Sequence, residues 1–421
     1  MINLEKITEK ELEQIDMLLN GDEAAAWAAY HVEPDVVAAF PITPQTIVVE
    51  RFSEFVADGL VRTEFVSVES EHSALSACVG AAAAGGRAFT ATAANGLQLM
   101  NEILYITSSL RLPVVMAIAN RAVSGPINIH CDHTDAMNVR DAGWIILFCE
   151  DAQEVYDTII QAFKIAEDPR VLLPVMVNFD GFLISHTAQK VRVFKDPTII
   201  REKFLGGPRK PVKIKLMGQE VELSLNPKNP IPVTFGPLDL FDYYYEHKRQ
   251  QLEAMQNAYQ VIKEVHEEYA KLSGRRYGDG LLVPYLIDDA DIVVIVMGSA
   301  AGTMRYVINE MREEGIKIGL LRVRSFRPFP YKEIAEYLKN TKVVGVFDRA
   351  QDQGMMGGPL FLEIRAALYD LDNRPKVVNY VFGLGGRDAP PELFREAFDE
   401  LVGLYKGEVK PFIRKYIGVR E

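Results

Sequence analysis

The chain has 421 residues, of which 48% are hydrophobic and 25% are charged, and its formal net charge is −12. This composition is typical of a soluble globular protein, and the length allows about two or three domains. The acidic balance argues against a general nucleic-acid-binding protein, which would carry a basic patch.

The cysteines and the N-terminus indicate the compartment. Cys78, Cys131 and Cys149 form no C-x-x-C pair, and three thiols are too few for a usual four-cysteine iron–sulfur cluster. Any cluster must therefore belong to another chain. Met1–Leu19 is charged and helical in pattern, without a signal-peptide core, and no apolar run could span a bilayer. We expect a soluble, cytoplasmic protein with no membrane or nucleic-acid partner.

The first part of the chain alternates short apolar segments with helical segments. The apolar segments are rich in β-branched residues, as in strands that are buried on both faces. The alternation predicts an α/β fold with a parallel sheet and helices on both faces. The strands are expected at Asp35–Phe40, Arg87–Thr92, Pro113–Ala119 and Leu172–Asn178, and the main helices at Ala94–Ser108 and Ala152–Ala166, the latter capped by Asp151.

The composition changes near Lys190, which divides the chain into three predicted regions. Residues 1–190 form the first domain, 191–285 a linker draped over a neighbour, and 286–421 a second α/β domain. The linker includes an expected hairpin at Lys210–Leu225 and a long amphipathic helix at Phe241–Leu272. In the second domain we expect strands at Ile292–Met297, Lys317–Val323, Lys342–Phe347 and Val377–Val381 and helices at Gly302–Glu314, Tyr331–Lys339 and Gly357–Tyr369.

Thr43 and Glu71 each have a structural and a functional interpretation. Thr43 lies between Pro41 and Pro44 at the end of a strand, where it could cap a helix whose first residue is Pro44, or contact a ligand, since open α/β sheets bind ligands at this edge. Glu71 lies just before a predicted helix rich in small residues, Ser73–Ala84, which Ser70 could cap and whose dipole Glu71 could complement. A carboxylate in that place could also hydrogen-bond a heteroaromatic nitrogen.

Three further motifs carry ionisable or glycine-rich groups. Arg121 follows an apolar strand and could bind a substrate carboxylate, or form a structural ion pair. The loop His130-Cys131-Asp132-His133-Thr134-Asp135 has no recognisable metal-ligand spacing, so we expect no metal. Gly278-Asp279-Gly280 followed by Asn309 imitates a thiamine-diphosphate motif but lacks the strand that should precede it. We interpret that match as a linker turn.

Taken together, these segments resemble the alpha subunit of the 2-oxoacid:ferredoxin oxidoreductases, in particular the pyruvate branch. The matches run in order through nearly the whole chain. They are PITP (Pro41–Pro44), VESEHSALSACVGA (Val68–Ala81), FTATAANGLQLMNE (Phe89–Glu102), RLPVVMAIANRA (Arg111–Ala122), PINI (Pro126–Ile129), DAGWI (Asp141–Ile145), LLPVMVNFDGF (Leu172–Phe182), VMGSAAGT (Val296–Thr303) and RVRSFRPFP (Arg322–Pro330).

The resemblance implies a thiamine-diphosphate-enzyme pyrimidine domain followed by a transketolase C-terminal-like domain. It implies that a beta subunit holds the diphosphate, magnesium and an iron–sulfur cluster. A ferredoxin-like delta subunit would carry further clusters, a gamma subunit would complete the complex, and the complex would dimerise. Coenzyme A would be the co-substrate and external ferredoxin the electron acceptor.

The resemblance also assigns roles to individual residues. Glu71 aligns with the glutamate that bonds the aminopyrimidine ring, with Glu69 as a second candidate, while Thr43 and Arg121 align with residues that contact the oxoacid. His130-Cys131 stands where pyruvate-type relatives usually carry Trp-Asn, in a loop expected to line the substrate pocket. Pyruvate is the expected substrate, and aryl, branched-chain or oxalate-type oxoacids remain alternatives.

Two other classes of function compete with this interpretation. A non-catalytic scaffold subunit could keep the fold, although Glu71, Thr43 and Arg121 are all present. A self-sufficient enzyme of the transketolase type would need a diphosphate-binding motif, and the only match to it is the turn at Asp279.

Overall fold

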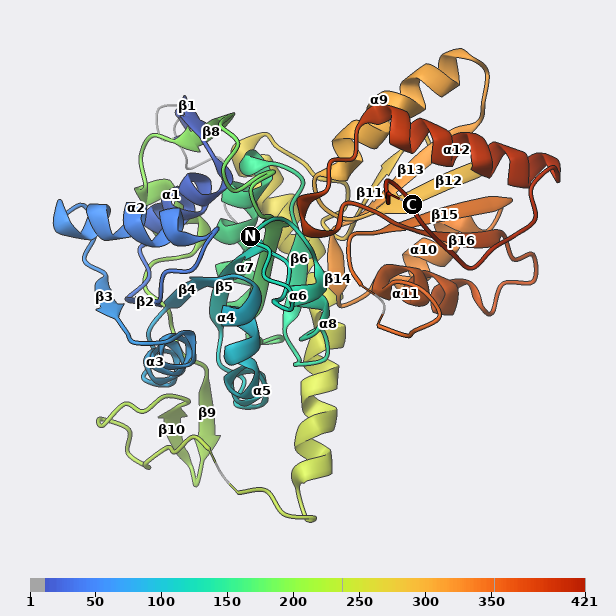
Figure 1. Ribbon diagram of the computed structural model, residues 1–421. Coiled ribbons are helices and arrows are strands. Elements are labelled where there is room, and N and C mark those ends of the chain that lie inside the picture. Colours follow the sequence, from blue (N-terminus) through green and yellow to red (C-terminus); the bar gives the residue numbers. More distant parts are fainter. Residues whose placement is uncertain (1–11, 237, 352, 421) are drawn as a thin grey trace.

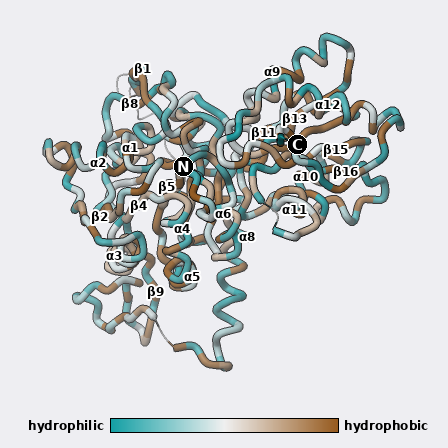
Figure 2. Tube along the Cα trace, viewed as in Figure 1, coloured by the Kyte–Doolittle hydropathy of each residue, from teal (hydrophilic) through white to brown (hydrophobic). Residues whose placement is uncertain are grey.

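A computed structural model describes residues 12–236, 238–351 and 353–420. Two α/β units lie side by side, and the long helix α8 (Tyr244–Ser273) runs along the first unit and projects beyond it (Figure 1). Apolar residues are concentrated in the strands of both units, whereas the projecting half of α8 is largely hydrophilic (Figure 2). No helix in the described ranges is both long and apolar enough to cross a lipid bilayer.

The first unit is built on a seven-stranded sheet in the order β14-β6-β7-β5-β4-β2-β3. All neighbouring strands are parallel except β14, which pairs antiparallel with β6. The strands are β2 (Val36–Ala39), β3 (Glu64–Ser67), β4 (Ala88–Thr92), β5 (Val114–Asn120), β6 (Ile145–Phe148), β7 (Val175–Asp180) and β14 (Ser325–Arg327).

Helices connect these strands and cover the sheet (Figure 1). Every residue of β5 is buried, as expected for a central strand with helices on both faces. The four strands predicted for this unit are confirmed as β2, β4, β5 and β7. The helices are α1 (Gly21–Val32), α2 (Thr46–Ala57), α3 (Glu71–Ala83), α4 (Ala94–Leu99), α5 (Asn101–Ser109), α6 (Thr134–Met137) and α7 (Ala152–Glu167), which Asp151 caps as predicted.

Two local predictions were wrong. The helix expected at Ala94–Ser108 is interrupted at Met100 and forms α4 and α5. The helical pattern expected within Met1–Leu19 is partly outside the described residues, and its remainder includes a strand, β1 (Gln14–Leu19). β1 pairs with β8 (Gln189–Phe194), so a partner distant in sequence overrides the local helical pattern.

The region between the two sheets packs partly on the first unit. It contains a hairpin of β9 (Lys213–Leu216) and β10 (Gln219–Glu222), a short π-helix at Ile199–Phe204, and α8. Arg209 donates hydrogen bonds to the carbonyl oxygens of Ala82 and Gly86, at the end of α3. This part of the linker therefore lies on its own chain.

The second unit has a six-stranded sheet in the order β11-β13-β12-β15-β16-β17, parallel except for β11. All four strands predicted there are present. The elements are β11 (Leu282–Tyr285), β12 (Ile292–Val296), α9 (Ala300–Glu313), β13 (Ile318–Val323), α10 (Tyr331–Leu338), β15 (Val343–Asp348), α11 (Pro359–Leu368), β16 (Lys376–Val381), a 3-10 turn at Leu384–Gly386, α12 (Pro391–Lys406) and β17 (Arg414–Tyr416).

Buried charges and a shared strand join the two units. β14 comes from the second unit in sequence, yet it completes the sheet of the first. Arg322 donates hydrogen bonds of 2.7 and 3.1 Å to the carboxylate of Glu154 on α7, and Arg324 bonds the same carboxylate. All three side chains are at most 2% exposed. Charges buried in this way stabilise the fold only while they remain paired.

Candidate active site

Four neighbouring strands of the first sheet end next to the residues that the sequence singled out. Thr43 follows β2, Glu71 follows β3, Gly96 follows β4, and Arg121 follows β5, and in the sheet these strands are adjacent in the order β5-β4-β2-β3. Because the strands are parallel, the four segments share one edge of the sheet. This carboxyl edge is where open α/β sheets bind ligands.

Glu71 is the first residue of α3, and its side chain is buried against the turn after β4. Ser70 caps α3 as predicted, accepting a hydrogen bond from the backbone N–H of Ser73. Glu71 is 6% exposed. A Cβ atom on Gly96 would lie 2.5 Å from Glu71 Oε1 and 2.5 Å from Thr92 Oγ1, so only glycine fits between these two side chains. Thr92 Oγ1 is itself buried without a hydrogen-bond partner in the described structure.

Glu69, the second candidate, differs from Glu71. It is exposed and accepts a hydrogen bond of 2.5 Å from Ser73 Oγ, which lowers the pKa of its carboxyl group. Glu69 therefore faces solvent, and its side chain bonds the first turn of α3, the helix that it precedes. Of the two carboxylates, Glu71 is the one placed to meet a ligand at the sheet edge.

Thr43 and Arg121 are in direct contact. Arg121 Nη1 donates a hydrogen bond of 2.7 Å to the carbonyl oxygen of Thr43, and its Nε donates one of 3.1 Å to the carbonyl oxygen of Asn128. Thr43 is exposed and Arg121 is 6% exposed. Burial lowers the pKa of Arg121 while Asp135 opposes that shift, and the guanidinium bonds neutral carbonyl oxygens instead of forming the structural ion pair considered above.

The capping role considered for Thr43 is wrong. α2 begins at Thr46, with Gln45 at the N-cap position, so Thr43 and Pro44 precede the helix. The side chain of Gln45 turns inward and donates hydrogen bonds to the carbonyl oxygens of Phe40 and Ala91. Gln45 thereby ties this loop to β4.

His130 and Cys131 lie on opposite sides of their loop. His130 is exposed and its ring packs on Phe182, with 4.7 Å between ring centroids. Cys131 is 0% exposed, and its sulfur accepts a hydrogen bond of 3.4 Å from Arg349. Of this pair, only His130 presents its side chain at the surface near Arg121.

Cys131, His133 and Asp180 converge in a group that resembles a metal site, because their potential ligand atoms lie within 4.8 Å of one another. A cationic group is already present at this place, because the guanidinium of Arg349 bonds both Cys131 and Asp180. Asp180 also lies 2.6 Å from His133 Nε2 and accepts hydrogen bonds from Ser299 N and Oγ. Although burial raises the pKa of Asp180, Arg349 and His133 together hold it below its usual value. A metal ion here would have to displace a guanidinium.

Sequence reasoning missed Asp180 and Arg349. They are 169 residues apart, and nothing in the local sequence of either indicates the other. Their positions gave the only signal, since Asp180 is the last residue of β7 and Arg349 directly follows β15.

The thiamine-motif match at Gly278-Asp279-Gly280 is a turn, as predicted. Asp279 Oδ1 accepts hydrogen bonds from the backbone N–H groups of Leu281 and Leu282, and Asn309 accepts one from Tyr285. Asp279 and Asn309 thus bond different partners. The motif holds a local turn together.

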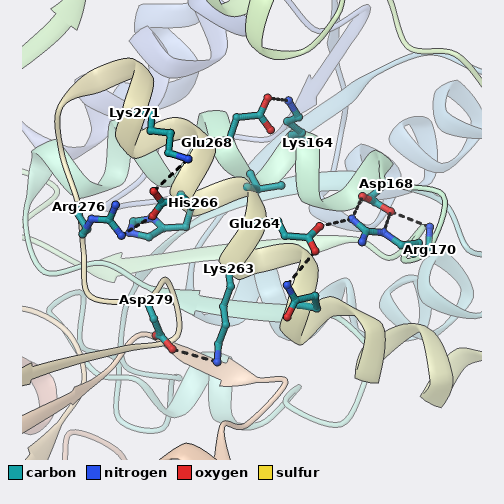
Figure 3. A pocket seen from close by; sticks show the side chains of 13 residues that line it. Lys164, Asp168, Arg170, Lys263, Glu264, His266, Glu268, Lys271, Arg276 and Asp279 are labelled. Carbon is teal, nitrogen blue, oxygen red and sulfur yellow. Dashed lines mark hydrogen bonds and ion pairs between the residues drawn. The ribbon is translucent and has the colours of Figure 1, made fainter. Parts of the chain in front are cut away.

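A pocket of about 670 Å³ between α7, α8 and the Asp279 turn is lined by charged side chains (Figure 3). Its cations are paired with its carboxylates, as in Arg170 with Asp168 and Glu264, and Lys263 with Asp279. Such pairing leaves little net charge to attract a ligand. The sheet edge is therefore the better candidate for the active site.

Comparison with known proteins identifies the family. The model of the family described as pyruvate flavodoxin/ferredoxin oxidoreductase, thiamine diphosphate-binding, matches residues 27–267, and that of the pyruvate:ferredoxin oxidoreductase core domain II matches residues 290–394. The pyruvate synthase subunit PorA of Thermotoga maritima is 50% identical over 96% of this chain and 98% of its own. That of Methanocaldococcus jannaschii is 48% identical over 88% and 91%. The ketoisovalerate oxidoreductase subunit VorA of Pyrococcus abyssi is 42% identical over 90% and 91%.

Two solved structures share the fold. The 2-oxoglutarate:ferredoxin oxidoreductase from Magnetococcus marinus, with 2-oxoglutarate, coenzyme A and succinyl-CoA bound, aligns with a TM-score of 0.69 at 19% identity, over 92% of this chain and 65% of that chain. This chain therefore spans slightly less than two thirds of that neighbour's length. A split-gene transketolase in an inactive beta4 tetramer aligns with a TM-score of 0.52 at 12% identity, over 92% and 98%. Both similarities confirm the predicted α/β fold. Since the first family model covers more than half of the chain and the relatives nearly all of it, the chain belongs to the pyruvate flavodoxin/ferredoxin oxidoreductase family, as its motifs predicted.

Proposed function

We propose that this chain is the alpha subunit of a pyruvate:ferredoxin oxidoreductase and binds the pyrimidine ring of thiamine diphosphate at the carboxyl edge of its first sheet. The observation that carries the proposal is the buried Glu71 carboxylate beside Gly96 and the unpartnered Thr92 Oγ1. A flat heteroaromatic ring fits an edge whose backbone carries no side chain at Gly96. The carboxylate and the hydroxyl supply polar partners for its nitrogens.

Each residue of the edge then has one task. Glu71 holds a proton against a ring nitrogen, Arg121 binds the carboxylate of the oxoacid, and Thr43 contacts the oxoacid from the neighbouring loop. Thiamine diphosphate, when bound, supplies the nucleophilic carbon and the electron sink for loss of carbon dioxide. The side chains of this subunit supply orientation and electrostatics.

The remaining components belong to other subunits. A beta subunit would hold the diphosphate, magnesium and a cluster, since Asp279 and Asn309 bond separate partners in this chain. Gamma and ferredoxin-like delta subunits would complete a complex that dimerises. The acyl group would pass to coenzyme A, and the electrons would pass through iron–sulfur clusters to ferredoxin. The naming of the relatives as subunits supports this assembly.

Pyruvate is the proposed substrate because relatives that are 50% and 48% identical to this chain are named pyruvate synthase subunits. A relative that is 42% identical is named for ketoisovalerate, so a branched-chain oxoacid is the second candidate. His130 would meet the acyl chain, because its backbone N–H bonds Asn128, whose carbonyl oxygen in turn accepts from Arg121.

The test uses the whole complex containing this chain, purified without oxygen. Reduction of a viologen dye is followed with pyruvate, a branched-chain, an aryl and an oxalate-type oxoacid, each with and without coenzyme A. We expect Glu71→Gln to lower turnover by about 100-fold or more, as for loss of a proton-transfer group, without loss of assembly. Glu69→Gln is the matched control and should be nearly unaffected. Near-normal turnover of Glu71→Gln would contradict the assigned role, and inactivity of the wild-type complex with every acid would support the scaffold alternative.

A further inference from the structure

A single buried carboxylate connects the parts of the proposed site. Asp135 is 0% exposed and accepts four hydrogen bonds. Its Oδ2 accepts from the backbone N–H groups of Arg121 at 2.9 Å and Ala94 at 3.0 Å. Its Oδ1 accepts from Asn120 Nδ2 at 2.8 Å and from the backbone N–H of Ala136 at 2.7 Å. All four donors are neutral, so the carboxylate of Asp135 serves as a hydrogen-bond acceptor that fixes the position of the surrounding backbone.

The two donors to Oδ2 lead to the two halves of the site. Arg121 carries the guanidinium that reaches Thr43. Ala94 begins the turn whose Gly96 lies against Glu71, and it has a φ of 42°. A left-handed backbone is unfavourable for alanine, so the surrounding contacts must hold it there. The hydrogen bond to Asp135 is such a contact.

The segment that bears Asp135 is held in place by hydrogen bonds to the second unit. The backbone N–H of His133 donates to the carbonyl oxygen of Arg349 at 2.8 Å, and that of Gln351 donates to Thr134 Oγ1 at 3.0 Å. The carbonyl oxygen of Cys131 accepts from Gly386 at 2.9 Å. The segment that bears Asp135 therefore has little freedom to shift.

We propose that Asp135 is a positioning residue, which sets the Arg121 backbone and the Ala94–Gly96 turn in register so that the oxoacid and the pyrimidine ring meet in reactive geometry. This inference rests on the proposed function, because it acts through Arg121 and Glu71. Displacement of reacting groups by about 1 Å can cost on the order of 100-fold in rate. A carboxylate can accept all four hydrogen bonds, whereas an amide of the same size has only one acceptor oxygen.

The test compares Asp135→Asn with Asp132→Asn in the complete complex. Asp132 is a buried acid on the same segment, but its Oδ1 accepts from Thr134 and reaches neither Arg121 nor Ala94. For Asp135→Asn we expect the KM for pyruvate to rise by about ten-fold or more and kcat to fall, while the KM for coenzyme A changes by less than about two-fold. For Asp132→Asn we expect the KM for pyruvate to stay within about two-fold of the wild type.

Arg121→Gln separates this inference from the proposed function. If Arg121→Gln raises the KM for pyruvate but Asp135→Asn matches Asp132→Asn, the positioning role is wrong and the proposed site stands. If Arg121→Gln leaves that KM unchanged, the proposed site itself is wrong. The double variant should be no worse in KM than Arg121→Gln alone, since both changes act on the same contact.

Should Asp135→Asn fail to assemble, Asp135→Glu replaces it. This variant keeps the carboxylate but moves it by one methylene. A rise of about three-fold or more in the KM for pyruvate supports the positioning role, and an unchanged KM overturns it.

Discussion

The two sheets of this protein have similar parallel cores but use their carboxyl edges differently. The edge of the first sheet leaves Thr43 exposed, and it carries Glu71 and Arg121, the residues proposed to contact the ligands. The corresponding edge of the second sheet is filled from within the chain. There, Asp180 of the first unit accepts hydrogen bonds from the backbone N–H and the hydroxyl of Ser299, next to α9.

This difference shows how one architecture can serve binding or assembly. N–H groups before a helix, which bind anions in many α/β proteins, here bind a carboxylate of the same chain. A Cβ atom on Gly298 would lie 2.7 Å from Asp180 Oδ1, so the two surfaces fit closely. The first edge gives the chain its proposed chemistry, and the second gives it a fixed arrangement of units.

The edge of the second sheet is closed by Asp180, and removing this carboxylate from the closed edge should have the largest effect on stability. Asp180→Asn removes the ion-pair partner of Arg349, which is 5% exposed. We expect a loss of about 3–5 kcal/mol in the free energy of unfolding, measured by denaturant titration. Asp16→Asn, at an exposed pairing with Lys190 and Arg192, is the control and should lose far less. Equal losses for the two variants would show that the closed edge contributes no more than a surface ion pair.

Adding a side chain at the open edge, which is the carboxyl edge of the first sheet, should lower turnover more than it lowers the free energy of unfolding. Gly96→Ala places a methyl group within 2.5 Å of Glu71 Oε1 and Thr92 Oγ1, so the carboxylate must shift. We expect turnover of the complex to fall by about 10- to 100-fold in the dye-reduction assay.

Gly80→Ala is the matched control for that variant. Gly80 lies within α3, and an added Cβ there would meet no atom within 4 Å. Turnover should be unchanged, and the free energy of unfolding should rise by about 0.5–1 kcal/mol, because alanine favours the helix. If both variants kept full turnover, the contact between Gly96 and Glu71 would have no part in the reaction.

Lowering the pH should affect the two edges differently, and we expect this effect to be smaller than those of the substitutions. Burial raises the pKa of Asp135 to about 6, although its hydrogen bonds oppose the shift, whereas the pKa of Asp180 lies below its usual value. As the pH falls through 6, Asp135 becomes protonated and loses acceptor capacity, while Asp180 stays ionised. Because the pKa of Asp135 is raised on folding, its protonation makes the folded state more stable as the pH falls from about 6 to the ordinary aspartate value of 3.8.

We therefore expect kcat/KM for pyruvate to decline with an inflection near pH 6 without unfolding. Arg121, Asp132 and His133 are ionisable neighbours of Asp135, and burial also raises the pKa of Asp348 to about 6, so the assignment needs a variant. In Asp135→Asn the residual activity should lack this inflection. An inflection that persists in the variant would assign the titration to another group.

The sequence predicted the central strands well because they are hydrophobic on both faces. β12 is apolar throughout, and β5 and β15 are apolar up to their last residues, Asn120 and Asp348, so burial determines most of each segment. Short edge strands such as β3 and β14 carry too few residues for a pattern, and β1 depends on a partner far along the chain. α12 was missed although Pro391 begins it and Gly407 follows it, which are ordinary boundary signals.

The candidate site was predictable where a residue follows a strand. The sequence placed Thr43 and Arg121 each at the end of a predicted strand, where open α/β sheets bind ligands, and in the structure the two residues are in contact. The acceptor role of Asp135 was not predictable, because its four donors come from the ends of two strands and from α6. The family motifs indicated which residues matter, and the structure showed how their backbones are connected.

The position of β14 has a consequence for how the protein is made. While a ribosome is still synthesising the second unit, the first sheet has β6 as an uncovered edge, since Ser325–Arg327 has yet to emerge. An uncovered strand edge can pair with other chains and promote aggregation. A chain shortened after α8 would keep that edge uncovered, so we expect such a fragment to aggregate more readily than the whole chain.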